Sequence, residues 1–323
     1  MWFSRQVPGG ISVDLQPPET EQEVADVART LLGAWRDATS GRDAVLFDRE
    51  LWTVLARAGL LDGGLPSLAG GAGFGLFEQC VVLAEVGRFG APVPYASSIA
   101  VATAIVAEFG TLDQIERWAL PVWQADATFG VVDGAGVSVR GGRLYGTNKA
   151  VAAGAFADFL LVITQDGVYL TCRSEFAVVM ARSRTTGGIS SAPVEFDGAD
   201  AERLAGQEAV ARAGARAALA SCAWRLGAME KALSTVAAHP RVQVGESITD
   251  AAEMRALVNR IRIGADELRT ALRQAAVCPP GDPNAERQLE AARHRAMLAA
   301  QAIRYAARLP DDDDVDSEDF PLR

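Results

Sequence analysis

The sequence predicts an α+β protein that is mostly helical, with a helical domain, a central β domain and a helical bundle following one another. Two observations predict this class. Apolar residues recur at helical spacing in both end regions, whereas the region between them has short runs rich in Val, Thr, Phe and Tyr, separated by glycine. With 323 residues, the chain is also longer than one compact core usually requires, so more than one domain is expected.

The first part of the chain is expected to be helical after an irregular lead-in. Residues 1–18 are rich in Pro and Gly, which favour loops. A glycine-rich loop, LLDGGLPSLAGGAGFG, is expected at 60–75, between the second and third helices of this part. We place a helical domain at 19–126, with helices expected over 19–38, 48–58, 76–89, 97–109 and 112–123.

The pattern changes to strands near residue 127. Segments such as TFGVV, VSVR, DFLLVIT and GVYLTC are short, β-branched and separated by turn residues. Strands at this spacing are typical of a small antiparallel barrel or sandwich. We therefore predict a β-barrel domain over 127–206.

Long helical patterns return after the β region. Helices are expected over 208–238, 249–277 and 283–309, and the middle one has a single apolar stripe made of Met254, Leu257, Val258, Ile261, Leu268 and Leu272. Such helices pack side by side, which predicts a C-terminal bundle over 207–309. The last segment, 310–323, is an acidic tail.

The net charge of -10 comes largely from that tail. Seven acids lie in it: Asp311, Asp312, Asp313, Asp314, Asp316, Glu318 and Asp319. The simplest interpretation of the tail is a solvated segment, and the alternative is a docking element. The remaining chain is nearly neutral and has no basic face, so we expect no nucleic-acid partner.

Metal-binding, membrane and export signals are absent from the sequence. The four cysteines have no CxxC spacing, which argues against a zinc site and a disulfide framework and favours a reducing cytoplasm. His239 and His294 are too far apart for a metal-ligand motif, so no metal is expected. No run approaches the ~20 apolar residues of a membrane span, and no signal peptide is recognisable.

Several motifs, in the same order along the chain, resemble one known family. In the helical part they are Leu51, Trp52, Leu55, Gly59, Leu60, Leu65, Pro66, Gly70, Gly71, Gly73, Glu85, Gly87, Arg88, Pro92, Val93 and Pro94, then FGTLDQIERWALP. In the β region they are Leu144, Gly146, Lys149, Val151, Ala157, Asp158, Leu161 and Val162. Together they make the chain similar to an acyl-CoA dehydrogenase over nearly its whole length.

This resemblance implies α,β-dehydrogenation of an acyl-CoA thioester with FAD. A carboxylate takes the α proton while the β carbon gives a hydride to the flavin, so the base and the flavin ring must lie on opposite faces of the substrate. In the family the base stands about ten residues before a helix glycine, or beyond the last bundle helix. Counting back from Gly227 reaches Ala217, and the tail has no matching glutamate. We therefore identify no catalytic base in this chain.

The resemblance assigns a possible flavin contact to the stretch HPRVQVGESI at 239–248. Arg241, Gln243 and Gly245 match the family's "R.QFG..I" pattern, with Val244 replacing its phenylalanine. These three residues are the predicted cofactor-binding residues, and in the family this segment reaches FAD held by a neighbouring subunit. The alternative is a plain helix-helix corner, with Pro240 ending one helix and Gly245 turning the chain.

Other family features of the flavin site are missing. The phosphate loop beyond the last helix is replaced by AIRYAARLPDDDD, whose aspartates would repel a pyrophosphate. The "W.T" or "W.S" positions that flank the flavin ring align with Val151 and Ala153, and the loop after the first strand shortens to VDGAGVS at 132–138.

We interpret the chain as a degenerate subunit of a heteromeric FAD enzyme. It resembles the short subunits of actinobacterial steroid side-chain acyl-CoA dehydrogenases, which implies a bulky steroid-type acyl-CoA, FAD at a subunit interface, a homologous partner subunit and an electron-transfer flavoprotein. Two alternatives remain: a non-catalytic structural partner that binds neither FAD nor substrate, and an independent homo-oligomeric acyl-CoA dehydrogenase with its base in the acidic tail.

Overall fold

The computed structural model describes residues 21–43, 45–62, 75–134, 136–178, 184–186, 189–238 and 248–277, and isolated residues between 284 and 294. Its first part is helical. The helices are α1 (Glu21–Ala38), α2 (Arg49–Arg57), α3 (Leu76–Phe89), η2 (Ala96–Thr103), α4 (Ala104–Phe109), α5 (Leu112–Gln114), η3 (Ile115–Ala119) and α6 (Leu120–Trp123). The sequence places most of these helices correctly, but η2 and η3 are π-helical turns that it does not predict.

Local side-chain hydrogen bonds fix where these helices begin. Asp48 caps α2, because its carboxylate accepts a hydrogen bond from the backbone N–H of Leu51 at 2.9 Å. The other carboxylate oxygen accepts one from the indole N–H of Trp35 at 2.8 Å, which ties α1 to α2. Thr111 and Gln114 form a reciprocal capping box at the start of α5.

The described strands form one nine-stranded sheet, in the order β6-β8-β3-β1-β4-β5-β9, with β2 beside β3 and β7 beside β8. The strands are β1 (Phe129–Val132), β2 (Val137–Arg140), β3 (Arg143–Ala152), β4 (Phe159–Ile163), β5 (Val168–Cys172), β6 (Ala177–Val178), β7 (Arg184–Thr186), β8 (Ile189–Asp200) and β9 (Glu202–Ala205).

The sheet differs from the predicted antiparallel pattern at one pair. β1 and β4 run parallel, with Phe129 beside Phe159, while the other described pairs are antiparallel. The reason is topological. β3 returns antiparallel beside β1, the chain turns after Ala152, and β4 joins the far side of β1 in the direction of β1 itself. Alternation along one strand carries no information about which partner it takes.

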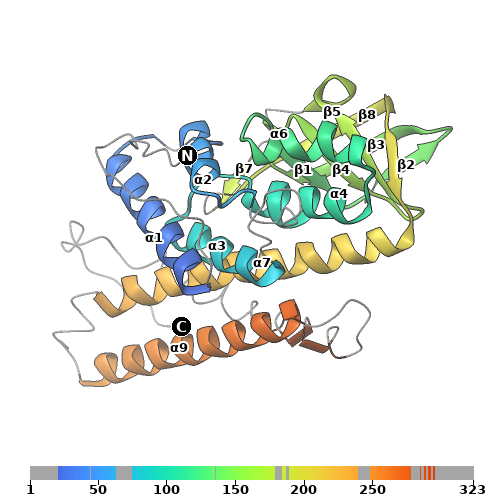
Figure 1. Cartoon of the computed structure of the whole chain (residues 1–323). Helices are drawn as coiled ribbons and strands as arrows, with labels where there is room; N and C mark the ends of the chain where they lie inside the picture. Colours follow the sequence, from blue (N-terminus) through green and yellow to red (C-terminus); the bar gives the residue numbers. More distant parts are fainter. Residues whose placement is uncertain are drawn as a thin grey trace, which may run out of the picture.

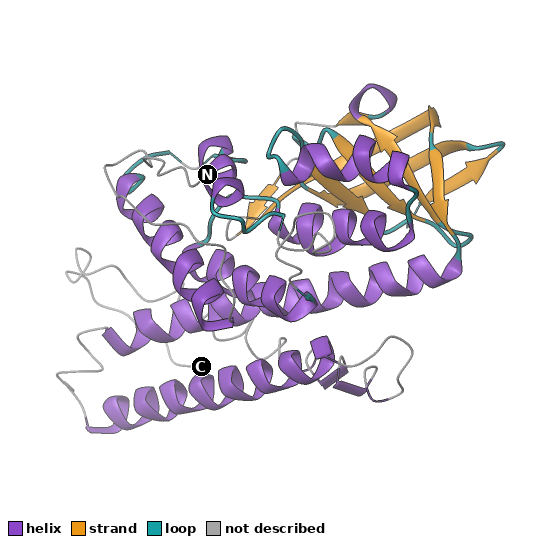
Figure 2. Cartoon of the chain, viewed as in Figure 1, coloured by secondary structure: helices purple, strands orange, loops and turns teal. Residues whose placement is uncertain are grey.

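Two long helices connect the parts of the molecule. α7 (Gln207–Ala238) passes along the sheet and the N-terminal helices, and α9 (Ile248–Val277) runs back beside it (Figure 1). The strands gather at one end of α7, whereas α3 crosses the middle part of α7 and α1 lies further from the strands (Figure 1 and Figure 2). The predicted third bundle helix and the acidic tail lie outside the ranges described in full.

The core is one large cluster with a smaller one inside the sheet. The large cluster joins α1, α2, α3, η2, α7 and α9 with one side of the sheet, and the smaller one contains Leu144, Val151, Leu160 and Phe196. Within the described ranges, no helix is long and apolar enough to cross a membrane. The same ranges contain no group of His, Cys, Asp and Glu arranged to hold a metal ion.

Candidate functional site

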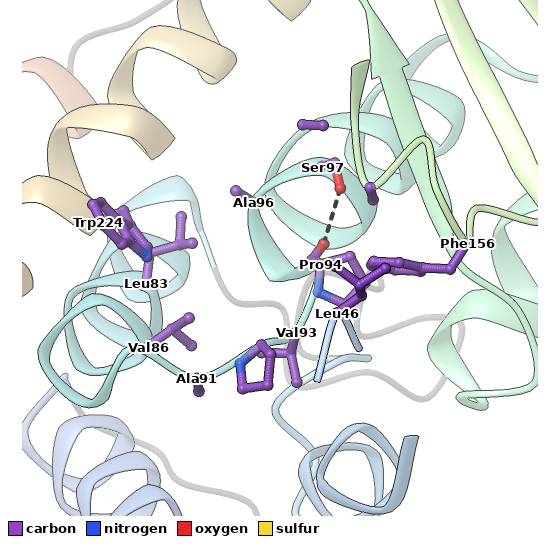
Figure 3. A pocket seen from close by; sticks show the side chains of 13 residues that line it. Leu46, Leu83, Val86, Ala91, Val93, Pro94, Ala96, Ser97, Phe156 and Trp224 are labelled. Atoms are coloured by element: carbon purple, nitrogen blue, oxygen red, sulfur yellow. Dashed lines mark hydrogen bonds between the residues drawn. The ribbon is translucent and has the colours of Figure 1, made fainter. Parts of the chain in front are cut away.

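A hollow lies where the N-terminal helices, the sheet and α7 meet (Figure 3). It contains about 450 Å³ of empty space, part of which is open to solvent. Its walls come from five parts of the chain and are formed by Leu46, Leu83, Val86, Ala91, Pro92, Val93, Pro94, Ala96, Ser97, Ala152, Ala153, Phe156 and Trp224. Leu46 is 36% exposed, and so it marks the side on which the hollow opens.

Two aromatic side chains stand on opposite sides of the hollow, Phe156 after β3 and Trp224 on α7 (Figure 3). Phe156 is held by stacking on Phe47, with the ring centroids 4.7 Å apart and the planes 9° from parallel. The turn before Phe156 places the non-glycine residue Ala153 at φ 60°, a left-handed conformation that costs an L residue about 1–2 kcal/mol. The hydrogen bond from Phe156 N to Ala153 O at 3.0 Å helps to hold this turn.

The position of Trp224 is fixed by a backbone contact between α3 and α7. A Cβ atom at Gly87 would overlap the carbonyl oxygen of Trp224, and a Cβ atom at Gly227 would overlap that of Ala84. Glycine is therefore required at both crossing points, since only a bare backbone allows this approach. This contact explains Gly87 and Gly227 without any role in chemistry.

The lining of the hollow is almost entirely apolar. Its polar side-chain groups are the indole N–H of Trp224 and the hydroxyl of Ser97. Ser97 is 6% exposed and donates a hydrogen bond to the carbonyl oxygen of Pro94 at 3.2 Å. No acidic or basic side chain is among the residues that line it. An apolar lining with one satisfied hydroxyl can bind a hydrophobic group, but it has no proton acceptor for general-base chemistry.

One of the two acids of α7, Glu230, is engaged in ion pairs. Glu230 pairs with Arg88 on α3 and with Arg269 on α9. Arg88 also lies 3.0 Å from the carboxylate of Glu85, which in turn pairs with Arg29 on α1 at 2.8 Å. This ion-pair chain links four helices and leaves its carboxylates bound to guanidinium groups, so it is a structural network.

A partly buried arginine, Arg216, lies between α3, η2 and α7. The guanidinium of Arg216 donates from Nε to Ala100 O and from Nη2 to Gln79 Oε1, both at 2.6 Å. Burial lowers the pKa of Arg216. The carbonyl that it caps belongs to the π-helical turn η2, so Arg216 pins this turn to α7.

Comparison with known proteins assigns this architecture. Residues 18–126 match the family described as "Acyl-CoA dehydrogenase, N-terminal domain". Acyl-CoA dehydrogenase FadE27 of Mycobacterium tuberculosis is 32% identical over 214 residues, 61% of this chain and 57% of the relative. The chain has the acyl-CoA dehydrogenase fold. It spans little more than half the length of FadE27 and of FadE28, the latter at 56%.

Two solved structures agree over most of the chain. The ChsE4-ChsE5 complex from Mycobacterium tuberculosis superposes with a TM-score of 0.76 at 27% identity and covers 91% of this chain and 86% of that chain. A variant of the Tcur3481-Tcur3483 steroid ACAD has a TM-score of 0.76 at 24% identity, with 90% and 87% covered. The predicted fold class and the predicted resemblance are thereby confirmed.

With the acyl-CoA dehydrogenase fold established, the missing base has a structural location. Ala217, where the family's helix glutamate was expected, is partly buried on α7 and packs against the large core cluster. Neither this residue nor its neighbours Arg216 and Ala218 supplies a carboxylate.

The lining of the hollow does not fit FAD. A flavin needs donors and acceptors for its polar ring edge and positive charge or free N–H groups for its pyrophosphate. No charged side chain is among the lining residues, and the one hydroxyl there is already bonded to Pro94. Val151 is fully buried in the smaller core cluster, and Ala153 contributes only a methyl group at the edge of the hollow. The shortened loop after β1 is tied to β3, because Asp133 accepts a hydrogen bond from Asn148.

The three predicted cofactor-binding residues, Arg241, Gln243 and Gly245, lie outside the described residues. Their role as flavin contacts or as a helix corner stays a prediction.

Sequence reasoning missed the residues that shape the hollow, above all Leu46, Phe156 and Trp224. One signal was present: Trp224 is the only aromatic residue on the alanine-rich helix α7, one turn before Gly227. Nothing in the sequence shows that these three positions converge, since they come from segments that are far apart along the chain.

Proposed function

We propose that this chain is a degenerate subunit of a heteromeric FAD enzyme that dehydrogenates a bulky, steroid-type acyl-CoA and is active only with a homologous partner subunit. The proposal is supported by the ChsE4-ChsE5 complex and the steroid ACAD among similar structures, which are heteromeric or steroid-directed by their own descriptions. Electrons would pass to an electron-transfer flavoprotein, and the enzyme would act in the cytoplasm.

The observation that carries this proposal is the apolar hollow without an acid. Removal of an α proton requires a carboxylate held within hydrogen-bond reach of the substrate. Here the helix position for that group is Ala217, and Glu230 is bound to Arg88 and Arg269. On this proposal the base and the flavin come from another chain.

This chain's own residues retain the capacity to bind the apolar part of a ligand. Phe156 and Trp224 offer flat apolar faces of the kind that suits a rigid ring system, and the surrounding side chains are apolar. The FAD contact, if Arg241, Gln243 and Gly245 make it, would complete a site that the partner holds.

Co-expression with a homologous acyl-CoA dehydrogenase from the same genome tests the proposal. The partner should carry the helix glutamate that is replaced by Ala217 here. We expect a stable complex that dehydrogenates a steroid side-chain acyl-CoA, and we expect glutamate-to-glutamine substitution in the partner to abolish turnover. Turnover by the present chain alone would favour the homo-oligomeric alternative. A complex whose partner is equally active without this chain would favour the purely structural one.

A further inference from the structure

The depth of the hollow depends on one side chain whose backbone is held in place by a neighbouring helix. Trp224 lies opposite Phe156 and beside Leu83 of α3 (Figure 3). The indole is attached to a backbone that touches α3 directly at Gly87, and one turn later α7 touches α3 again at Gly227. The separation of these two helices is therefore set by contact between backbones.

Because the two helices are fixed, the size of the side chain at position 224 determines how far the hollow extends toward α7. Leu83 and Val86 of α3 are fully or almost fully buried, at 0% and 2% exposure, so they belong to the packed core and have no room to retreat. Trp224 is only partly buried and presents its ring to the empty space. A smaller side chain at this position would lengthen the hollow toward α7 without moving either helix.

We propose that Trp224 is the residue that sets the largest apolar group the hollow admits. This inference rests on the proposed function, because it takes the apolar part of an acyl-CoA as the occupant. Trp224 acts by size: the indole excludes longer or wider groups, and its flat face packs on the groups that do fit. Phe156 forms the opposite wall, and its stacking on Phe47 holds its ring in place.

Binding to the full-length chain alone tests this inference without flavin or turnover. The probes are hexanoyl-CoA, dodecanoyl-CoA and choloyl-CoA, each titrated into wild type, Trp224→Ala and Trp224→Phe by calorimetry. We expect Trp224→Ala to shift the affinity ratio of the larger probes over hexanoyl-CoA by about tenfold or more, in keeping with the ~10- to 200-fold that one methylene is worth in an apolar pocket. Trp224→Phe should shift the ratio in the same direction and by less.

Trp118→Ala is the matched control. Trp118 is another partly buried indole, but it contacts Phe159 and donates to Glu202, away from the hollow. Its removal should leave the affinity ratio unchanged. Equal ratios in wild type and both Trp224 variants would overturn the inference, as would failure of wild type and variants to bind any of the probes. Should Trp224→Ala not fold, Trp224→Phe still decides the question.

The two proposals fail separately. A shifted affinity ratio together with an inactive co-expressed complex would retain the role of Trp224 and remove the proposed heteromeric enzyme. An active complex with unshifted ratios would do the reverse.

Discussion

Two glycines determine how closely α3 and α7 approach each other. The carbonyl oxygens of Trp224 and Ala84 occupy the places where side chains at Gly87 and Gly227 would begin. Glycine inside a helix normally costs stability, by ~0.5–1 kcal/mol relative to alanine. Its presence at these crossings is therefore explained by packing, which also fixes the wall of the hollow.

Gly227→Ala should lower the free energy of unfolding by about 1 kcal/mol. The new methyl group forces the helices apart, and such overpacking typically costs ~1–3 kcal/mol, which outweighs the gain of ~1 kcal/mol in helix propensity. Urea denaturation measures the change. Gly214→Ala is the matched control on the same helix, because nothing lies within 4 Å of its would-be Cβ atom. It should stabilise the protein by ~0.5–1 kcal/mol, and an equal loss in both variants would show that the crossing is not tight.

Arg241 is the residue on which the predicted flavin contact depends. A guanidinium donates paired hydrogen bonds to phosphate oxygens and stays charged at all relevant pH values. If Arg241 completes the partner's FAD site, Arg241→Ala should cost ~1.5–3 kcal/mol of binding, or roughly ten- to a hundredfold in FAD affinity. Flavin absorbance of the assembled complex measures this. Arg262→Ala, at an exposed position of α9, is the control; equal flavin occupancy in both variants would mean that HPRVQVGESI is only a corner between helices.

At the scale of elements, one carboxylate joins the N-terminal helices to the sheet. Glu202 on β9 accepts hydrogen bonds from Gln114 at 2.8 Å, from Arg117 at 3.0 Å and from Trp118 at 3.1 Å. All three donors belong to the stretch FGTLDQIERWALP, which the sequence analysis singled out as a family feature. The structure gives this stretch a physical role, because it anchors η3 to the end of the sheet.

The stability contributed by Glu202 should depend on pH. Burial alone raises the pKa of Glu202, but hydrogen bonds from Arg117, Gln114 and Trp118 outweigh it and bring the pKa below the ordinary 4.5. A lowered folded-state pKa means that this stability is complete above pH 4.5 and is lost as the pH falls through the folded value. Glu202→Gln should therefore be less stable at neutral pH and lose less on acidification. Thermal melting between neutral and acidic pH checks this, and parallel curves for both proteins would contradict it.

At the scale of the whole molecule, the sequence predicted the elements better than the contacts between them. Helical periodicity and the caps at Asp48 and Thr111 are local, so the helix ends could be read along the chain. The π-helical turns and the parallel β1/β4 pair could not, since they depend on partners distant in sequence. Counting back from Gly227 reaches Ala217, and the absence of a base in this chain stays a prediction. The hollow was not predictable, because it requires five separate segments to be placed together.

The central claim is that this chain does not own a complete flavin site. The most direct measurement is the visible absorbance spectrum of the chain purified alone, compared with that of the complex co-purified with its homologous partner. We predict little or no FAD and no acyl-CoA dehydrogenation in the chain alone, and a flavin-containing, active complex. A yellow homo-oligomer of this chain with stoichiometric FAD would contradict the claim.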